Sequence, residues 1–146
     1  MPIRDEVLFC VQDVYAQSFI EGKKTIELRR RAPNISSETR VWVYSKLPIG
    51  AVRLTANVTE IRTMETGDIW EKYKSDIDLT EGAFRSYFSG VSTGAAIFLN
   101  NIKKIEHPIY LHDIRQIVPG FHPPQFFRWI RNGSAELSLF RTRIGE

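Results

Sequence analysis

Hydrophobic and polar residues follow different periods along the chain, and the period predicts which segments form strands and which form helices. The mostly apolar run EVLFCVQ over 6–12 predicts a strand. Asp13 follows this run and is expected to be the N-cap of a short helix over 14–22, which Gly22 would end in a left-handed conformation. Further strands are predicted where apolar and polar residues alternate or β-branched residues are frequent: 24–30, 40–46, 51–63 and 93–106.

The remaining segments predict short helices and a final strand. Apolar residues at helical spacing occur in 67–76 and in 81–90, where Thr80 is the expected N-cap. A turn of helix, a helix led by prolines and a final strand are expected, in this order, over 111–117, 121–133 and 136–143. This order does not fit regular strand–helix–strand winding. We therefore expect an α+β fold, a small mixed or antiparallel β-barrel with helices on its surface.

Length and composition limit the class of protein. The chain of 146 residues is long enough for one domain with an ordinary core, so residues 1–146 are taken as a single domain. Its 42% hydrophobic and 25% charged residues are typical of a folded soluble protein. No apolar run approaches the ~20 residues of a membrane-spanning helix, and residues 1–5 lack the apolar part of a signal peptide. A cytoplasmic location and no membrane partner are expected.

Several kinds of site are disfavoured by the residues present. Cys10 is the single cysteine, so no internal disulfide can form, and its apolar neighbours predict a buried thiol. The sequence has no glycine-rich phosphate loop, no cysteine pair and no histidine pair at the spacing of metal ligands. We therefore expect neither a metal site nor a cofactor. The net charge of +3 favours anionic partners only mildly, because it does not say where the charges lie.

The strongest chemical signal is the charged stretch FIEGKKTIELRRRAP over 19–33. Strand alternation places Glu27 and Arg29 on one face with their Cα atoms ~7 Å apart, so they either pair or point to one ligand. Lys24 follows Gly22 in the turn between helix and strand, and is expected to reach the same pocket. The alternative is a solvated strand rim whose charges protect a sheet edge, and the residue types by themselves favour that alternative.

These residues resemble a known family. Gly22, Lys24, Glu27 and Arg29 match the Gly-x-Lys-x-x-Glu-x-Arg signature of ASCH domains, members of the PUA-like superfamily. The segments VQDVYAQSFIEG, VWVYSKLPIGAV and FHPPQFF are also similar to family sequences, so the resemblance covers most of the chain. It implies a PUA-like β-barrel with peripheral helices and a cleft beside the barrel that the signature lines. It also implies binding of RNA or nucleotides, often with a regulatory role; some relatives hydrolyse acetylated cytidine or cleave RNA.

Such a cleft suggests a role for each polar residue near the signature. Lys24 and Arg29 would hold a phosphate or carbonyl oxygen. Glu27 would accept hydrogen bonds from a base amino group or orient Arg29, and Ser45, beside Tyr44, would add a hydroxyl group. One or two aromatic residues are expected to stack on a base, from a set most of whose members build the core: Tyr15, Trp42, Tyr44, Phe121, Phe126 and Phe127.

Five further basic residues are candidates for a rim that attracts an RNA backbone: Lys23, Arg30, Arg31, Arg128 and Arg131. Arg30 and Arg31 adjoin the signature without belonging to it. A solvated face is an equally good interpretation of these charges.

Three functions are open at this point. A module that binds RNA or a modified nucleotide without chemistry is favoured, because no pair of nucleophile and base is evident. In an amidohydrolase acting on N4-acetylcytidine, Lys24 and Glu27 would be the catalytic residues, with Lys24 as an activated amine of lowered pKa. Hydrolase relatives tend to carry threonine where this chain has Glu27, and Thr25 is a candidate replacement. A metal-dependent RNA-cleaving enzyme would need carboxylates beside Glu27, for which the chain offers only distant residues: Asp76, Asp78 and Glu81.

Overall fold

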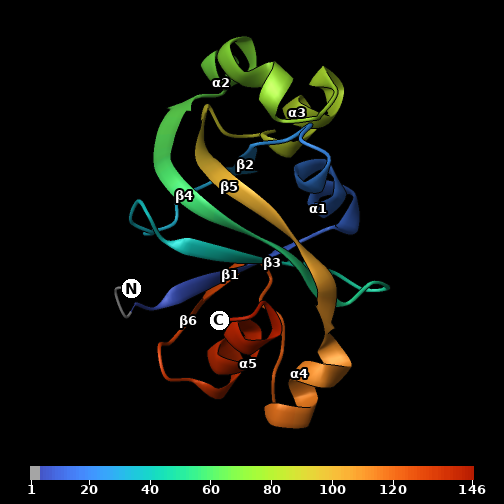
Figure 1. Cartoon of the computed structure of the whole chain (residues 1–146). Helices are drawn as coiled ribbons and strands as arrows, with labels where there is room; N and C mark the ends of the chain where they lie inside the picture. Colours follow the sequence, from blue (N-terminus) through green and yellow to red (C-terminus); the bar gives the residue numbers. More distant parts are fainter. Residues whose placement is uncertain (1–3) are drawn as a thin grey trace.

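The computed structural model describes residues 4–146, which form a six-stranded sheet flanked by helices (Figure 1). The strands are β1 (Glu6–Val11), β2 (Ile26–Arg29), β3 (Arg40–Ser45), β4 (Ala51–Glu65), β5 (Thr93–Tyr110) and β6 (Phe127–Ile130). The helices are α1 (Asp13–Ile20), α2 (Thr66–Tyr73), α3 (Glu81–Tyr87), α4 (Leu111–Ile117) and α5 (Ala135–Arg143), with a 3-10 turn over Lys74–Asp76. Every helix in this part of the chain is too short or too polar to cross a membrane.

The sheet has the order β2-β5-β4-β3-β1-β6, and all neighbours are antiparallel except β1 and β3. The predicted α+β fold is confirmed, but the sheet is not closed into a barrel: among the described residues, β2 and β6 are its edges. Each edge strand has only four residues. Within residues 4–146, no backbone hydrogen bonds join β2 and β1. A side chain connects them instead, because Arg29 Nη2 of β2 donates to the Cys10 carbonyl of β1 at 3.5 Å.

The centre of the sheet is buried on both faces, as β1 illustrates. Val7 and Phe9 pack into a cluster with α1, whereas Leu8 and Cys10 pack into a second cluster with α4 and α5. A strand that is buried on both sides has no polar face, which explains the nearly continuous apolar run over 6–12. The Cys10 thiol is buried as predicted, and burial raises its pKa.

The edge strand β2 shows the predicted alternation. Ile26 and Leu28 pack under α2 and α3 in a third apolar cluster, at the end of the molecule opposite α4 and α5 (Figure 1). Glu27 and Arg29 form an ion pair beside β1. Gly22, before this strand, has a φ of 78°, so the predicted left-handed end of α1 is confirmed.

The N-termini of two helices test the capping predictions. Thr80 is the N-cap of α3 as predicted, and its side-chain oxygen accepts a 3.1 Å hydrogen bond from the Ala83 N–H. Asp13 is not the N-cap of α1, because Gln12 takes that position and Asp13 lies in the first turn. The Asp13 carboxylate instead accepts a 2.7 Å hydrogen bond from Arg53 of β4. The ion pair with Arg53 thus engages a carboxylate oxygen of Asp13 that would otherwise be free to cap the helix.

The predicted helix over 121–133 is wrong. Phe127–Ile130 within it forms β6, which lies antiparallel to β1. Without β6, the backbone N–H and C=O groups along one side of β1 would have no hydrogen-bond partner, and buried backbone groups are nearly always paired. The need of β1 for a second neighbour therefore outweighs the local helix signal of the prolines.

The predicted strand over 136–143 is also wrong, because these residues lie in α5. The helix begins after Ser134, whose hydroxyl oxygen accepts a 3.3 Å hydrogen bond from the Leu137 N–H. Leu137 and Phe140 are three residues apart, which places them on one face of the helix, and both are fully buried. The sequence of 136–143 therefore fits the period of a helix as well as the alternation of a strand.

Candidate functional site

A cavity of about 220 Å³ opens at the seam between the β2 edge and the end of β1. Lys24, Glu27 and Arg29 line this cavity together. The other polar and aromatic residues that line it come from the start of α1, from the turn after β3 and from α3: Gln12, Tyr15, Lys46 and Tyr87. No sequence pattern marked Lys46, because the turn that carries it comes close to β2 only in the folded chain.

Glu27 is the centre of the charged group in this cavity. Its Oε2 accepts a 2.6 Å hydrogen bond from Arg29 Nη2, and its Oε1 lies 3.7 Å from Lys24 Nζ. The exposed fraction is 7% for the Glu27 side chain, 3% for Lys24 and 17% for Arg29. Because each carboxylate oxygen already faces one cation, Glu27 fixes the positions of both.

The Lys24 ammonium group lies in largely apolar surroundings. Its Nζ is 5.3 Å from the centroid of the Tyr15 ring and 5.4 Å from that of Phe19. Burial lowers the pKa of Lys24 below its ordinary value; Glu27 opposes this shift, and the nearby charge of Arg29 adds to it. A buried amine of lowered pKa can act as a base or nucleophile at a lower pH than an exposed lysine.

Arg29 has donors that the protein itself does not use. Its Cζ lies 3.6 Å from the centroid of the Phe126 ring, so the guanidinium group stacks on that ring. Nη2 donates to Glu27 and to the Cys10 carbonyl. Neither Nε, which is buried, nor Nη1 has a hydrogen-bond partner within residues 4–146. Arg29 is thus held by one nitrogen and one ring face, and its Nη1 N–H groups are left for a ligand, whereas the buried Nε would first have to become exposed.

Residues 76–78 lie against the signature although they are far from it in the sequence. The Thr25 N–H donates to the Asp76 carbonyl at 2.9 Å, and Lys24 Nζ donates to the Ile77 carbonyl at 3.4 Å. These backbone carbonyls help to place Lys24 at the end of the cavity. Thr25, the candidate replacement for the hydroxyl group of the hydrolase relatives, does not line the cavity.

The carboxylates considered as metal ligands do not gather around Glu27. Asp78 accepts a 2.5 Å hydrogen bond from Ser18, and Glu81 pairs with Arg85 at 2.5 Å. Within residues 4–146, no group of three or more His, Cys, Asp and Glu side chains could hold a metal ion. The arrangement needed for the metal-dependent alternative is therefore not assembled here.

Tyr44 and Ser45 lie apart from the cavity. Tyr44 belongs to the apolar cluster with α4 and α5, and burial raises the pKa of its phenol. Ser45 is completely buried at the end of β3. In the described part of the chain neither hydroxyl group has a hydrogen-bond partner, and neither residue lines the cavity. Ligand contact by these two residues stays a prediction, and it would require their hydroxyl groups to become exposed.

Of the six aromatic residues considered for base stacking, Tyr15 lines the cavity and the others do not. Trp42 and Phe121 are core residues with almost no exposed surface. Phe126 stacks on Arg29 instead. Tyr87 of α3, which was not among the residues expected to stack, also lines the cavity. It is 38% exposed and donates a 3.2 Å hydrogen bond to the backbone of β2. A tyrosine on the exposed side of a predicted helix was the signal that could have found it.

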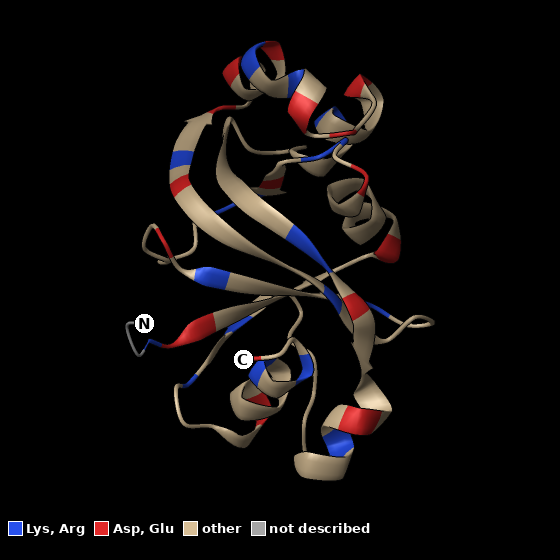
Figure 2. Ribbon diagram, viewed as in Figure 1, with Lys and Arg blue, Asp and Glu red and all other residues tan. Residues whose placement is uncertain are grey.

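The five candidate rim residues fall into two groups, three beside β2 and two on or next to β6: Lys23, Arg30, Arg31, Arg128 and Arg131. Arg30 donates to the carbonyls of Tyr87 and Ser89 and so holds the end of α3. Arg131 pairs with Asp5 at 2.7 Å. None of the five lines the cavity, and Figure 2 shows basic and acidic residues interleaved along the ribbon. A continuous rim is therefore not evident.

Comparison with known proteins links most of the chain to one family. The sequence family described as Domain of unknown function (DUF365) matches residues 5–120. A curated relative, the ASCH domain-containing ribonuclease of Zymomonas mobilis, is 31% identical over 131 residues, which are 90% of this chain and 88% of the relative.

Solved structures share the fold. The crystal structure of ASCH from Zymomonas mobilis has a TM-score of 0.87 at 29% identity and covers 94% of each chain. Human THYN1, in complex with 5-methylcytosine-containing DNA, has a TM-score of 0.59 at 7% identity, over 97% of this chain and 98% of that one. The N-terminal domain of McrB from Staphylothermus marinus reaches 0.59 at 10% identity, over 95% and 92%. The last two likenesses concern the fold alone, whereas the likeness to the Zymomonas mobilis structure confirms the predicted ASCH-type α+β fold, with an open sheet in place of the expected barrel.

Proposed function

Because the chain belongs to the ASCH domain family, we propose that it binds RNA in the cavity lined by Lys24, Glu27 and Arg29 and cleaves the RNA there. The observation that carries the proposal is the buried Lys24 amine, whose pKa is lowered beside an arginine with unused donors. The Zymomonas mobilis relative, aligned with 90% of this chain, is named a ribonuclease, and this supports RNA as the substrate class.

Binding would use groups that already line the cavity. A phosphate group would accept hydrogen bonds from the free donors of Arg29 and lie near Lys46. An unstacked base would lie against Tyr15 or Tyr87, which is how single-stranded RNA is usually held. The volume of about 220 Å³ is below that of a typical drug-sized pocket and suits one base or phosphate group. Glu27 would orient Arg29, since both of its oxygens are engaged.

Cleavage would transfer the phosphate group to the neighbouring ribose oxygen. Burial favours the neutral form of Lys24, and in this form the amine would take the proton of a 2′-hydroxyl group, whose oxygen attacks the adjacent phosphorus. The bond from phosphorus to the 5′-oxygen of the next nucleotide breaks, and this oxygen receives a proton from the Lys24 ammonium group. Arg29 stabilises the negative charge that develops on the phosphate oxygens. The products are a 2′,3′-cyclic phosphate and a free 5′-hydroxyl group.

Hydrolysis of N4-acetylcytidine is the alternative that the same amine would serve. It is ranked second because Thr25 does not line the cavity, so the hydroxyl group of the hydrolase relatives has no replacement there. An RNA-binding module without chemistry differs from both enzymes in leaving its ligand unchanged.

The test is incubation of the protein with a single-stranded RNA, the DNA of the same sequence and N4-acetylcytidine, all with a metal chelator, followed by mass spectrometry. Lys24→Met is the diagnostic variant, and Lys72→Ala, an exposed lysine of α2, is its matched control. We expect cyclic-phosphate products from RNA alone, in the wild type and the control. Bound but intact RNA would indicate a binding module, and release of acetate would indicate the amidohydrolase.

The salt dependence of RNA affinity measures how much backbone is held. Each neutralised phosphate of a single strand contributes a slope of about −0.7 to the plot of log affinity against log salt. Since no continuous rim is evident, we expect a shallow slope, which corresponds to about one or two neutralised phosphates. A steep slope would indicate that the RNA backbone contacts an extended basic surface, as the sequence suggested.

A further inference from the structure

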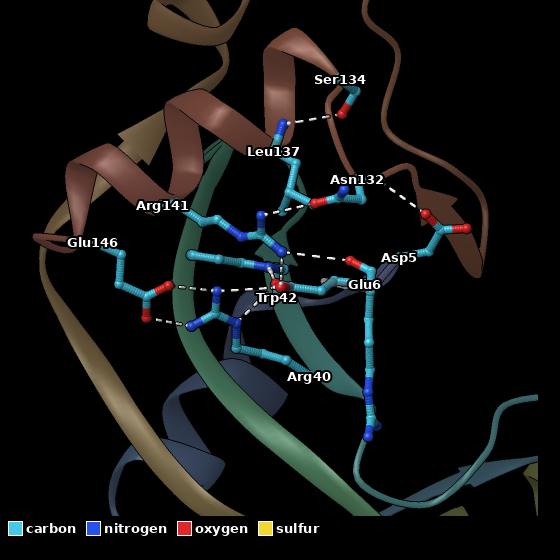
Figure 3. Close-up of polar contacts among 10 residues, drawn as sticks. Asp5, Glu6, Arg40, Trp42, Asn132, Ser134, Leu137, Arg141 and Glu146 are labelled. Carbon is cyan, nitrogen blue, oxygen red and sulfur yellow. Dashed lines mark hydrogen bonds and ion pairs between the residues drawn. The ribbon is translucent and has the colours of Figure 1, made fainter. Parts of the chain in front are cut away.

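A second oxyanion-binding arrangement lies at the start of β3, in a group that shares no residue with the lining of the Lys24 cavity (Figure 3). Its centre is Arg40. The Arg40 Nε donates a 2.7 Å hydrogen bond to Glu6, and its Cζ lies 4.7 Å from the centroid of the Trp42 ring. Glu6 also accepts a 2.7 Å hydrogen bond from the Trp42 indole N–H. The inner edge of the guanidinium group is thus fixed by the sheet.

The outer edge of Arg40 holds a carboxylate in a forked arrangement. Its Nη1 and Nη2 donate to the two oxygens of Glu146 at 2.5 and 2.8 Å. Glu146 follows α5, and 37% of its side chain is exposed. Two parallel N–H groups of an arginine match a phosphate group as well as they match a carboxylate. Glu146 therefore occupies a position that an external phosphate group fits.

The space around Glu146 is large enough for an anion bigger than a carboxylate. A cavity of about 640 Å³ beside Glu146 is lined by the basic residues Arg4, Arg40, Lys103 and Arg141 and also by the acidic residues Asp5, Glu6 and Glu38. An adjoining cavity of about 500 Å³ adds Lys104, Arg143 and Glu106. Lys103 makes no ion pair within residues 4–146. A phosphomonoester carries roughly −1.5 to −2 charges and three acceptor oxygens, against one charge and two oxygens for Glu146.

We propose that Arg40 and Lys103 form a binding site for a phosphate group, which the Glu146 side chain occupies when no ligand is bound. The site is independent of the proposed RNA cleavage. Binding would turn Glu146 outward, while Glu6 keeps Arg40 in place.

Competition between the two anions follows from the charges around Glu146. Hydrogen bonding from Arg40 lowers the pKa of Glu146, and the charges of Arg141 and Lys103 lower it further, although partial burial opposes the shift. The carboxylate is therefore ionised at neutral pH, and a ligand must displace it as an anion. Attachment of α5 to the sheet does not depend on Glu146, because Arg141 of α5 also bonds Glu6 at 2.5 Å.

The test is calorimetric titration of the full chain with inorganic phosphate. Glu146→Gln keeps the shape of the side chain and removes its charge, so we expect phosphate affinity to rise at least fivefold. Lys103→Ala should lower it at least fivefold, whereas Lys72→Ala should leave it unchanged. If Glu146→Gln binds phosphate no better than the wild type, the carboxylate only fastens the chain and the proposal is wrong.

Two further arms identify the source of the phosphate group and separate this site from the Lys24 cavity. A mononucleotide with a 5′-phosphate and an RNA without terminal phosphates compete against inorganic phosphate, so the better competitor distinguishes a phosphomonoester from an RNA backbone. Lys24→Met should retain phosphate binding at Arg40, which nuclear magnetic resonance detects as a shift of the Arg40 Nε–H signal. If Lys103→Ala loses that shift and Lys24→Met keeps it, the result supports the site at Arg40. If Lys24→Met loses the shift, the phosphate binds in the Lys24 cavity and the proposal is wrong.

Discussion

Glu6 and Glu27 are both buried glutamates, and each lies between two cationic side chains. Around Glu6 the pairing is tight. Arg40, Arg141 and the Trp42 indole donate to its two oxygens at 2.7, 2.5 and 2.7 Å (Figure 3). Burial by itself would raise the pKa of Glu6, but the hydrogen bonds from Arg40, Arg141 and Trp42 outweigh it and lower the pKa.

Around Glu27 the pairing with Arg29 is equally tight at 2.6 Å, but the pairing with Lys24 is looser. Lys24 lies 3.7 Å from the nearer carboxylate oxygen, and the Arg29 Nε is buried without a hydrogen-bond partner in the described residues. A buried donor without a partner costs free energy and is uncommon in native structures. A buried carboxylate between two cations thus occurs in two settings: the Glu6 group joins α5 to the sheet, whereas the Glu27 group lies beside a cavity, where we propose that it binds a ligand.

Glu6→Gln should produce the largest change, a loss of about 3 kcal/mol of unfolding free energy, because two partly buried guanidinium groups lose their charged partner. Urea denaturation measures it. Glu60→Gln is the control, since Glu60 and Arg62 form an exposed pair that contributes at most about 1 kcal/mol. Equal effects of the two substitutions would show that burial of the Glu6 group does not matter and that the contrast with Glu27 is only apparent.

Lys24→Met should lower RNA cleavage about a hundredfold or more, the size of a general-base contribution. It should lower the unfolding free energy by less than Glu6→Gln does, because Glu27 keeps its ion pair with Arg29. Methionine also fills the same apolar space without the amine. Single-turnover cleavage and urea denaturation of the same samples give both numbers. A variant that cleaves normally would remove Lys24 from the mechanism, and one that unfolds would make it part of the core.

Arg29→Lys should weaken RNA binding about tenfold even though the charge is kept. Lysine has no planar fork, so it cannot donate to Glu27, stack on Phe126 and present free N–H groups at once. One lost charge-assisted hydrogen bond contributes roughly 1.5 to 3 kcal/mol. Fluorescence anisotropy measures the RNA affinity of Arg29→Lys beside that of Arg29→Ala. Wild-type affinity in the lysine variant alone would mean that only charge matters at this position.

The pH dependence of stability gives the smallest and most specific difference. The folded-state pKa of Glu6 is lowered from 4.5, so its stabilising contribution is complete above about pH 4.5 and is lost as the pH falls through the folded value. The stability difference between wild type and Glu6→Gln should therefore be constant from pH 7 to 5 and shrink below, by at most about 1.4 kcal/mol per pH unit. A difference that does not change in acid would assign the stabilisation to packing.

Local patterns were sufficient for most single elements of this fold. Alternation in 24–30 placed Glu27 and Arg29 on one side of β2, and Thr80 marked the start of α3. The segments 121–133 and 136–143 were assigned incorrectly, because their state depends on what β1 and the sheet need from them rather than on their own periods. The open sheet, in place of the expected barrel, has the same origin, since closure depends on how two edges meet.

The sequence by itself determined the family, the α+β class and the three charged residues of the signature, because spacing along one strand is a property of the chain. Only the tertiary structure decided that Lys24 is buried against Tyr15 and that Arg29 stacks on Phe126. It also decided that Tyr44 and Ser45 are closed off from the cavity and that Arg40 holds Glu146. Each of these contacts joins segments from different elements, and the period of one segment carries no information about which other segment comes to lie against it.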